Sequence, residues 1–311
     1  MQHIHIPVLL TETLRFLNLK PGDTVIDCTL GEGGHALPML ERIAPDNEGQ
    51  HAGRLIAFEL DAESIERAKH RLRRYAGHFT VLHENFSHLE SAAAPHLDGK
   101  PVNGILFDLG LSRFEVKEGT HGFSFERDAP LDMRLDRSLT VTAADVVNQW
   151  PMDKLIWVFQ EYGQEKFSYP LAAHICRVRR QQKFTTTRQL SEAVLLVIRN
   201  TLHSRKEIPW VGGLHPATRV FQALRIAVND ELGNLERALP QALSLLAPGG
   251  RLAVIAFHSA EDRIIKNFFR SESRAAHATL LTKKPVVPTD EERKTNPSSR
   301  SAKLRAIQKE L

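Results

Sequence analysis

The chain has 311 residues and a formal net charge of +4, with 42% hydrophobic and 25% charged residues. This composition is ordinary for a soluble globular protein with one large domain or two smaller ones. No apolar run approaches the roughly 18 residues of a membrane span, so we expect no membrane association. The two cysteines form no C-x-x-C motif, which excludes a disulfide scaffold. The N-terminus lacks a signal-peptide pattern, and we therefore expect a cytoplasmic protein.

The expected elements of the first hundred residues alternate between strand and helix. His3 and His5 precede them without a third ligand, so no metal site is predicted. Buried strands separated by helices of 10–15 residues are typical of βαβ units in a parallel sheet. The patterns predict strands at 23–30, 53–61, 79–86 and 102–110, and helices at 35–44 and 62–76.

The βαβ pattern is interrupted after about residue 112. Residues 117–138 are loop-like, and the segment from about 142 to 202 has helical periodicity. A long helix is then expected from Thr218 to Leu246, followed by a fifth strand at 251–259 that rejoins the sheet. The tail beyond Pro288 is expected to be loosely held.

These elements predict a doubly wound, mostly parallel α/β domain interrupted by an all-helical domain. The expected division is residues 1–112 and 213–311 for the α/β domain and 113–212 for the insertion. Basic residues also cluster: residues 166–206 hold nine Lys and Arg against one acid, and residues 263–311 hold twelve against five. Such clusters are either solvated faces or contact surfaces for a polyanion such as RNA, and charge alone leaves both open.

The segment VIDCTLGEGGHA, residues 25–36, joins the first strand to the first helix through Gly31, Gly33 and Gly34. It lacks the third glycine of G-x-G-x-x-G, which disfavours a dinucleotide. An acid four residues ahead of the first glycine, Asp27, better suits S-adenosylmethionine. The glycines would let the backbone face its methionine part, and the carboxylate would meet its ammonium. A glycine turn without a ligand remains the alternative.

Three other strand ends carry candidate site residues, because ligands bind outside the carboxyl ends of parallel strands. Glu59 follows the second strand and suits ribose hydroxyls, although an acid after a strand is common. Phe86 follows the third strand and suits adenine, or simple core packing. Asp108 ends the apolar fourth strand and is either a functional carboxylate or a helix cap.

Two further segments carry candidate contacts to the molecule that would accept the methyl group of the cofactor. His258, at the end of the fifth strand, is placed to approach an acceptor base, while Ser259 and Asp262 are expected to form a capping box that opens a helix. The loop after the fourth strand offers aromatic and cationic side chains of the kind that hold an unstacked RNA base. These candidates are Phe123, Phe125, Arg127 and Arg134. The alternative is a structured loop whose Asp and Arg residues pair with one another.

Eight collinear motifs resemble one family. They are HIPVLLTETL, DCTLGEGGH, GILFDLGLS, GFSFERDAPLDMRLD, EYGQEKF, HPATRVFQALRIAVNDEL, APGGRLAVIAFHS and NPSSRSAKLRA. Their order and spacing resemble the RsmH (MraW) methyltransferases, the 16S ribosomal RNA (cytosine-N4)-methyltransferases of bacteria. The resemblance runs from His5 to about Ala306.

The resemblance implies a class I S-adenosylmethionine-dependent methyltransferase with a helical insertion, and a cytidine N4 in the decoding region as acceptor. It implies 16S rRNA as the partner. The inserted basic domain favours the assembled small ribosomal subunit over free RNA, and we expect a monomer or homodimer. Carried over by motif, the cofactor contacts are Gly33, Gly34, His35, Glu59, Phe86, Asp108 and Glu115.

Three positions depart from the family pattern. Glu59 stands where the family usually has Asp, Glu115 where it has a cofactor-contacting Gln, and Ala260 where it has Leu. Asp108, with the backbone carbonyls beside it, is the expected acceptor of the amine hydrogens of the cytosine. Two rival functions stay open: a nicotinamide-dependent oxidoreductase, and an RNA-binding assembly factor without catalysis.

Overall fold

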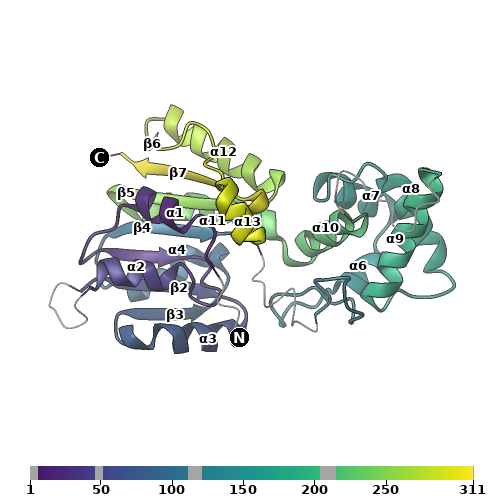
Figure 1. The fold of residues 1–311 in the computed structure, drawn as a ribbon, viewed down its shortest axis with the longest axis horizontal. Helices are drawn as coiled ribbons and strands as arrows, with labels where there is room; N and C mark the ends of the chain where they lie inside the picture. Colours follow the sequence, from purple (N-terminus) through teal and green to yellow (C-terminus); the bar gives the residue numbers. More distant parts are fainter. Residues whose placement is uncertain (1–5, 46–51, 111–120, 204–214, 311) are drawn as a thin grey trace. The chain divides into compact units, whose positions relative to one another are not determined.

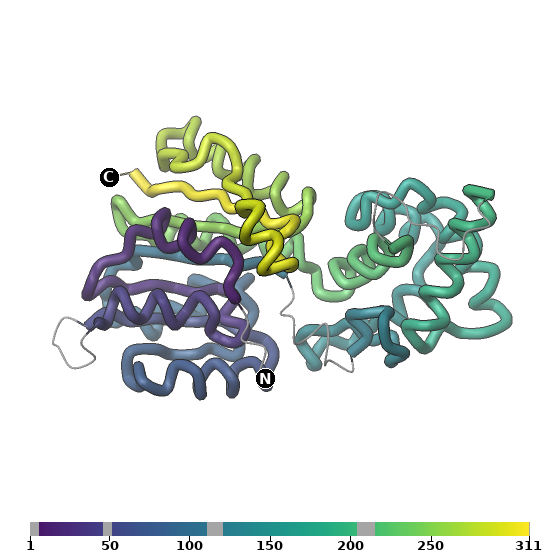
Figure 2. The backbone as a smooth tube through the Cα atoms, in the orientation of Figure 1, coloured from purple at the N-terminus to yellow at the C-terminus, as the bar shows by residue number. Residues whose placement is uncertain are grey.

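The computed structural model describes residues 6–45, 52–110, 121–203 and 215–310, which fold into two compact units. One unit is built from residues 1–110 and 232–311, and the other from residues 111–231 (Figures 1 and 2). Within the described residues, no helix has the length and apolar character needed to cross a membrane.

The first unit is organised around a seven-stranded sheet with the order β3-β2-β1-β4-β5-β7-β6. Its strands are β1 (Thr24–Asp27), β2 (Arg54–Glu59), β3 (Phe79–His83), β4 (Val102–Asp108), β5 (Leu246–Ala256), β6 (Ala278–Leu280) and β7 (Lys303–Lys309). The first five strands are mutually parallel, which confirms the expected parallel sheet. Only β7 runs antiparallel to its neighbours β5 and β6.

Helices cover both faces of this sheet. The helices on one face are α1 (Leu10–Leu17), α2 (Ala36–Ile43) and α3 (Ala62–Leu72), and those on the other are α4 (Leu89–Ala93), α11 (Glu231–Leu245) and α12 (Ser259–Arg274). Each face has its own apolar core, because successive residues of the buried strands point to opposite sides. Short 3-10 turns at Arg73–Tyr75, Phe86–His88, Ala94–His96 and Pro297–Ser301 complete the connections.

The expectation of a loose tail is wrong. After α13 (Asp290–Thr295), β7 pairs with β5 over six residues, from Arg251 opposite Gln308 to Ala256 opposite Lys303. Strand β7 contributes Leu304, Ala306 and Ile307 to the buried core. Its sequence KLRAIQK is short and rich in charge, so alternation alone did not mark it as a strand.

The second unit is helical and has a separate core. Its helices are α6 (Ala143–Gln149), α7 (Met152–Glu161), α8 (Ser168–Val178), α9 (Thr187–Thr201) and α10 (Ala217–Asn229). Helices α6 and α9 both begin with capping boxes, Thr142 with Asp145 and Thr186 with Gln189, which satisfy amides that a helix start leaves unpaired.

The second domain boundary lies later in the chain than expected, and the long helix expected after that boundary is divided in two. The long helix expected from Thr218 to Leu246 is two helices, because Asp230 adopts a left-handed conformation (φ 48°) between α10 and α11. Helix α10 belongs to the helical unit, where its buried face packs on α7, α6 and α9. Its last residue, Asn229, also bonds the backbone of Met133 and Leu135 in the loop after β4. The unit therefore ends at residue 231 rather than 212.

Candidate active site

The glycine loop leaves β1 at Asp27 and enters α2 at Ala36. Gly31 (φ 51°) and Gly33 (φ 76°) have left-handed backbones, which glycine adopts without strain. The amide of Gly33 donates to the carbonyl of Leu30 at 2.9 Å, which closes a tight turn. A Cβ at Gly31 would meet nothing within 4 Å, so this side of the loop is open. The loop therefore leaves backbone uncovered at Gly31, and its contact with a ligand stays a prediction.

Glu59 ties the end of β2 to this loop. Its Oε2 accepts a hydrogen bond from the amide of Gly31 at 2.7 Å, and its Oε1 accepts from the amides of Leu60 at 2.7 Å and Asp61 at 2.9 Å. Burial raises the pKa of Glu59, and these three amide bonds oppose that rise. A carboxylate offers about four acceptor directions, so three amides leave one for a ribose hydroxyl.

Asp27 is a buried carboxylate behind the loop. Its side chain has 0% exposure, and its Oδ1 accepts from the amide of Thr29 at 3.1 Å. Its Oδ2 is buried without a hydrogen-bond partner among the described residues. Burial raises the pKa of Asp27 to about 6. Buried oxygens without a hydrogen-bond partner are uncommon in folded proteins, so Asp27 is a distinctive carboxylate of this region.

Asp108, at the end of β4, lies against His35. Its Oδ2 is 3.2 Å from Nδ1 of His35, and its amide donates to the hydroxyl of Thr29 at 2.6 Å. Its Oδ1 is buried without a hydrogen-bond partner in the described part of the chain. His35 is only 5% exposed, and its Nε2 lies 3.0 Å from the carbonyl oxygen of Val8. Its imidazole is thus engaged with the protein on both sides.

Phe86 begins the short helical turn after β3. Its ring meets Phe107 of β4 edge to face, with centroids 5.5 Å apart, and packs against the core. The residue is half-buried, so core packing does not account for its whole surface. Both sequence interpretations, core residue and adenine contact, fit this position.

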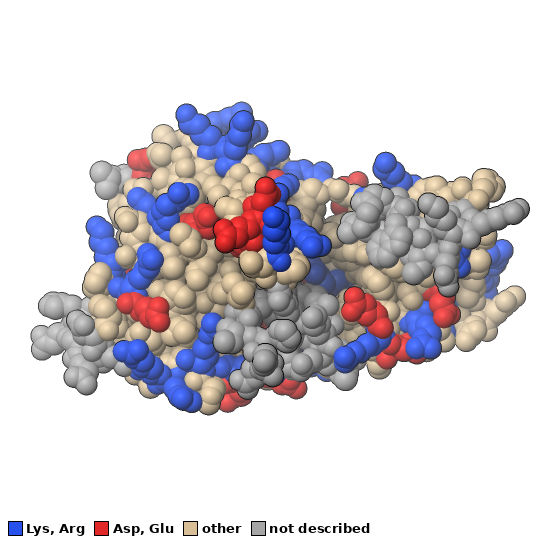
Figure 3. All heavy atoms as spheres, in the orientation of Figure 1, with Lys and Arg blue, Asp and Glu red and all other residues tan. Residues whose placement is uncertain are grey.

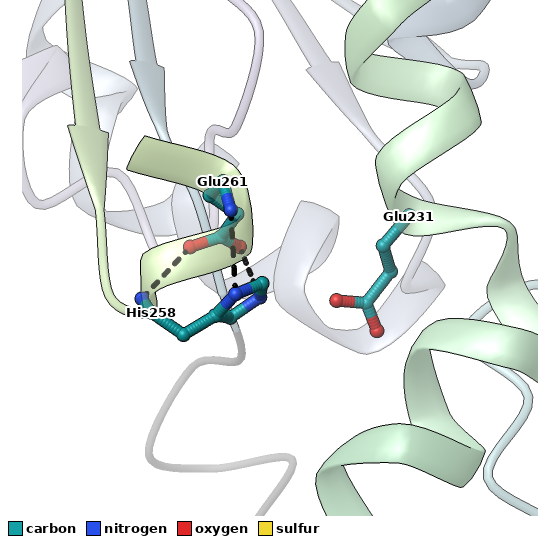
Figure 4. A group of neighbouring side chains, drawn as sticks. All are labelled: Glu231, His258 and Glu261. Atoms are coloured by element: carbon teal, nitrogen blue, oxygen red, sulfur yellow. Dashed lines mark hydrogen bonds and ion pairs between the residues drawn. The ribbon is translucent and has the colours of Figure 1, made fainter. Parts of the chain in front are cut away.

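His258 is the N-cap of α12 and not a free side chain. Its Nδ1 accepts from the amide of Glu261 at 3.4 Å, and Glu261 accepts from the amides of Phe257 and His258, at 2.8 and 3.2 Å (Figure 4). The imidazole Nε2 lies 3.1 Å from the other Glu261 oxygen. The capping box is therefore His258 with Glu261, and the expected box of Ser259 with Asp262 is wrong.

Asp262, which was expected in that capping box, pairs with basic residues of β7 instead. Asp262 bonds Nε of Arg305 on β7 at 2.7 Å, and Lys303 lies 3.6 Å from its other oxygen. Glu231, also drawn in Figure 4, belongs to the helical unit, where both its oxygens accept bonds from Arg225 at 2.7 Å.

The four candidate RNA contacts differ in their surroundings. Phe125 stacks on His215 with centroids 4.5 Å apart, and Phe123 packs against the helical core. Arg134 donates to both oxygens of Asp132, at 2.6 and 2.9 Å. Packing and pairing within the unit thus occupy these three, which favours the structured-loop interpretation for them. The side chain of Arg127 is exposed.

Two participants were missed by sequence reasoning. Thr29 accepts a hydrogen bond from the backbone amide of Asp108 through its hydroxyl, and its own amide donates to the side chain of Asp27. Its place between the strand and the first glycine could have indicated this role. Val8 acts through a backbone carbonyl, for which a single sequence carries no signal. Glu115 lies outside the described residues.

Fold and site together define a class of protein. A parallel sheet with one antiparallel strand in the order 3-2-1-4-5-7-6, a glycine loop after β1 and carboxylates at the ends of β2 and β4 are the arrangement of class I S-adenosylmethionine-dependent methyltransferases. The expected fold class is confirmed.

The comparisons with known proteins identify one family. The sequence model of the MraW methylase family matches residues 2–310. A ribosomal RNA small subunit methyltransferase H of Symbiobacterium thermophilum is 44% identical, covering 98% of this chain and 96% of that protein. Proteins of the same name from Carboxydothermus hydrogenoformans and Heliobacterium mobile are each 40% identical over 99% of this chain and 99% and 100% of theirs. The chain belongs to the MraW methylase family.

Proposed function

We propose that this protein transfers a methyl group from S-adenosylmethionine to the exocyclic N4 of a cytidine in the decoding region of 16S ribosomal RNA. Family membership supports methyl transfer, and relatives that match nearly end to end are called ribosomal RNA small subunit methyltransferases. The single observation that carries the choice of chemistry is the carboxylate of Asp108 at the end of β4, which is 17% exposed and lies 3.2 Å from Nδ1 of His35.

The residues at the strand ends fit the cofactor. The backbone of Gly33 and Gly34 would face its methionine part, Asp27 its ammonium and Glu59 its ribose, with Phe86 beside the adenine. Asp27 supports this fit best, because its buried Oδ2 lacks a partner among the described residues and its burial raises its pKa to about 6. An ammonium there would supply both a hydrogen-bond donor and a compensating charge. The bound cofactor supplies a methyl group already activated on a sulfonium sulfur.

The acceptor nitrogen needs help from the protein. The lone pair of the cytosine amine is delocalised into the ring, so the amine is a weak nucleophile. A carboxylate that accepts an amine hydrogen returns electron density to the nitrogen, and it can take the proton lost when the N–C bond forms. The carboxylate of Asp108 is the acceptor we assign to this step. General base assistance of this kind contributes about 10²–10⁴-fold.

The RNA must present the base outside its stack. Lys and Arg side chains on both units offer phosphate contacts, and on the face drawn in Figure 3 they gather over α12, among other places. We propose the small ribosomal subunit as the partner, the cytoplasm as the location, and a monomer or homodimer as the working form.

Substitution of Asp108 tests the assignment. Asp108→Asn keeps the size of the side chain but removes the negative charge, and we expect kcat to fall by about 10²-fold or more at saturating cofactor. The measurement is methyl transfer from radiolabelled S-adenosylmethionine to small ribosomal subunits from cells that lack this gene. Near-normal turnover of the variant would exclude the assigned role. The same assay separates an enzyme from an assembly factor, which would transfer no methyl group.

A further inference from the structure

The imidazole of His35 lies between two oxygen acceptors. Nε2 is 3.0 Å from the carbonyl oxygen of Val8, and Nδ1 is 3.2 Å from Oδ2 of Asp108. A carbonyl oxygen accepts but never donates, so the proton of a neutral ring must sit on Nε2. A hydrogen bond to Asp108 then requires a second proton, shared between Nδ1 and Oδ2. That proton belongs on the imidazole, which is ordinarily the stronger base by more than two pKa units.

The charged groups around the ring also favour the protonated form of His35. Burial would lower the pKa of His35, but the carboxylates of Asp108 and Asp27 and the carbonyl of Val8 outweigh it and raise that pKa. The two acids come from neighbouring parallel strands, β4 and β1, so a cationic ring between them offsets buried negative charge. The ring therefore joins the two carboxylates of the candidate site electrostatically.

The carbonyl of Val8 is itself held in place. The next residue, Leu9, has a left-handed backbone (φ 50°, ψ 36°) and is fully buried. Its amide donates to Glu292 of α13 at 2.8 Å, and the side-chain amide of Asn296 donates to the carbonyl of Ile6 at 3.0 Å. Residues 6–9 are thus fixed on both sides of Val8 by the C-terminal part of the chain.

We propose that His35 is a positioning residue, a cationic imidazole that is anchored by Val8 and fixes the orientation of the Asp108 carboxylate at the end of β4. In this arrangement both ends of the chain contribute to the site. Residues near the C-terminus fix residues 6–9, Val8 fixes the tautomer and orientation of His35, and His35 fixes Asp108. The test below has a kinetic part, which rests on the proposed function, and a spectroscopic part, which is independent of it.

The first arm of the test needs no activity. Nitrogen-15 NMR of the imidazole rings in the full-length protein reports whether each ring nitrogen carries a proton. We expect both nitrogens of His35 to be protonated at pH 7, and the ring to lose a proton above the ordinary histidine pKa of about 6.5. A neutral ring at pH 7, with one protonated nitrogen, would overturn the proposal whatever the enzyme methylates.

The second arm separates the two contacts of the ring. In His35→Asn the side-chain amide can replace Nδ1 but not reach Val8, and in His35→Gln it can replace Nε2 and bond Val8 while losing Asp108. Both variants lose the positive charge. We expect kcat at pH 7 to fall in both variants, because each loses the positive charge beside the carboxylate of Asp108. The larger loss of kcat at pH 7 is expected in His35→Gln.

A matched control uses another carboxylate-paired histidine. His277 lies 2.9 Å from Glu272, but its side chain is 66% exposed. His277→Gln is expected to leave kcat and its pH profile unchanged. If both His35 variants fold and bind cofactor but lose kcat equally at every pH, the ring is a packing element and the proposal is wrong. Should either variant fail to fold, the NMR measurement on the unaltered protein decides.

Discussion

The amide of Gly31 donates a hydrogen bond to Oε2 of Glu59 at 2.7 Å, so the glycine loop after β1 is tied to the end of β2. The resemblance leads one to expect the shorter Asp at this position. The extra methylene of Glu allows one carboxylate to accept from Gly31 while also accepting from Leu60 and Asp61. The loop is therefore fixed by the side chain that we propose to contact the ribose.

Shortening or removing this side chain should affect cofactor binding unequally. Glu59→Ala removes the acceptor of three amides and the expected ribose contact, so we expect the Kd for S-adenosylmethionine to rise by about tenfold or more. Glu59→Asp restores the carboxylate of the family pattern and should stay within about threefold of the unaltered protein. Calorimetric titration measures both. Equal affinity of Glu59→Ala and the unaltered protein would exclude the assigned contact.

Asp27 makes the stability of the cofactor-free protein depend on pH. Its pKa is raised to about 6 in the folded protein from an ordinary value of 3.8, so the folded state keeps a proton that the unfolded state has lost. The free energy of unfolding should therefore fall as the pH rises from about 4 to 6, by about 3 kcal/mol at most. The raised pKa of His35 extends this fall above pH 6.5.

The variant Asp27→Asn removes the first part of that slope. Urea unfolding at pH 4.5 and pH 6.5 should show a clearly smaller difference for Asp27→Asn than for the unaltered protein, while its affinity for S-adenosylmethionine falls. Asp290→Asn, at a carboxylate that is 90% exposed, is the control and should keep the original slope. An unaltered slope in Asp27→Asn would contradict the burial argument.

Asp262 links the last strand to α12. Removing it by Asp262→Ala leaves Arg305, only 7% exposed, without its carboxylate, and a buried charge that loses its partner costs about 3–5 kcal/mol. Chemical denaturation should show most of this loss. Glu66→Ala breaks the exposed pair with Lys69 and should cost about 0.5 kcal/mol or less. A loss below 1 kcal/mol in Asp262→Ala would show that β7 is held without this pair.

The turn between α8 and α9 is the place to test RNA contact. Arg180 and Lys183 are exposed there. The double variant Arg180→Glu with Lys183→Glu should weaken binding to small ribosomal subunits by about tenfold and reduce its salt dependence, with cofactor affinity unchanged.

A control for this variant carries the same charge change elsewhere. Lys20 and Lys100 are exposed and precede the parallel neighbours β1 and β4, so they lie at the edge of the sheet opposite the candidate site. Reversing both charges should leave subunit binding within about twofold. Equal losses in the two double variants would mean that net charge alone, rather than a local surface, governs association.

Sequence reasoning was most successful where periodicity is strong. The apolar strands β1, β2 and β4 were each expected within three residues, whereas β5 begins at Leu246, earlier than the expected residue 251. The carboxyl ends of β2 and β4 carry Glu59 and Asp108, because parallel strands end at one edge. Sequence reasoning failed where tertiary contacts or a single residue determine the local structure. The short strand β7 is specified by its pairing with β5, and the break at Asp230 depends on a single left-handed residue.

In the candidate site, too, the sequence carried a signal for some features and none for others. Residue types at motif positions indicated which side chains gather, but not what they contact. The contact of His35 with the cofactor stays a prediction, but the position of its ring between Val8 and Asp108 was not expected. The partner is a backbone carbonyl near the start of the chain, which no local pattern marks. His258 was expected near the acceptor base, and its ring caps a helix.

Nucleoside mass spectrometry of small-subunit RNA tests the central claim most directly. Subunits from cells without this gene would be incubated with the purified protein and S-adenosylmethionine labelled with deuterium in the methyl group. We predict a labelled cytidine whose methyl group is on N4, mapped by nuclease digestion to the decoding region, and no label with Asp108→Asn. A label on carbon 5 of the base, on the ribose or outside the small-subunit RNA would contradict the proposed function.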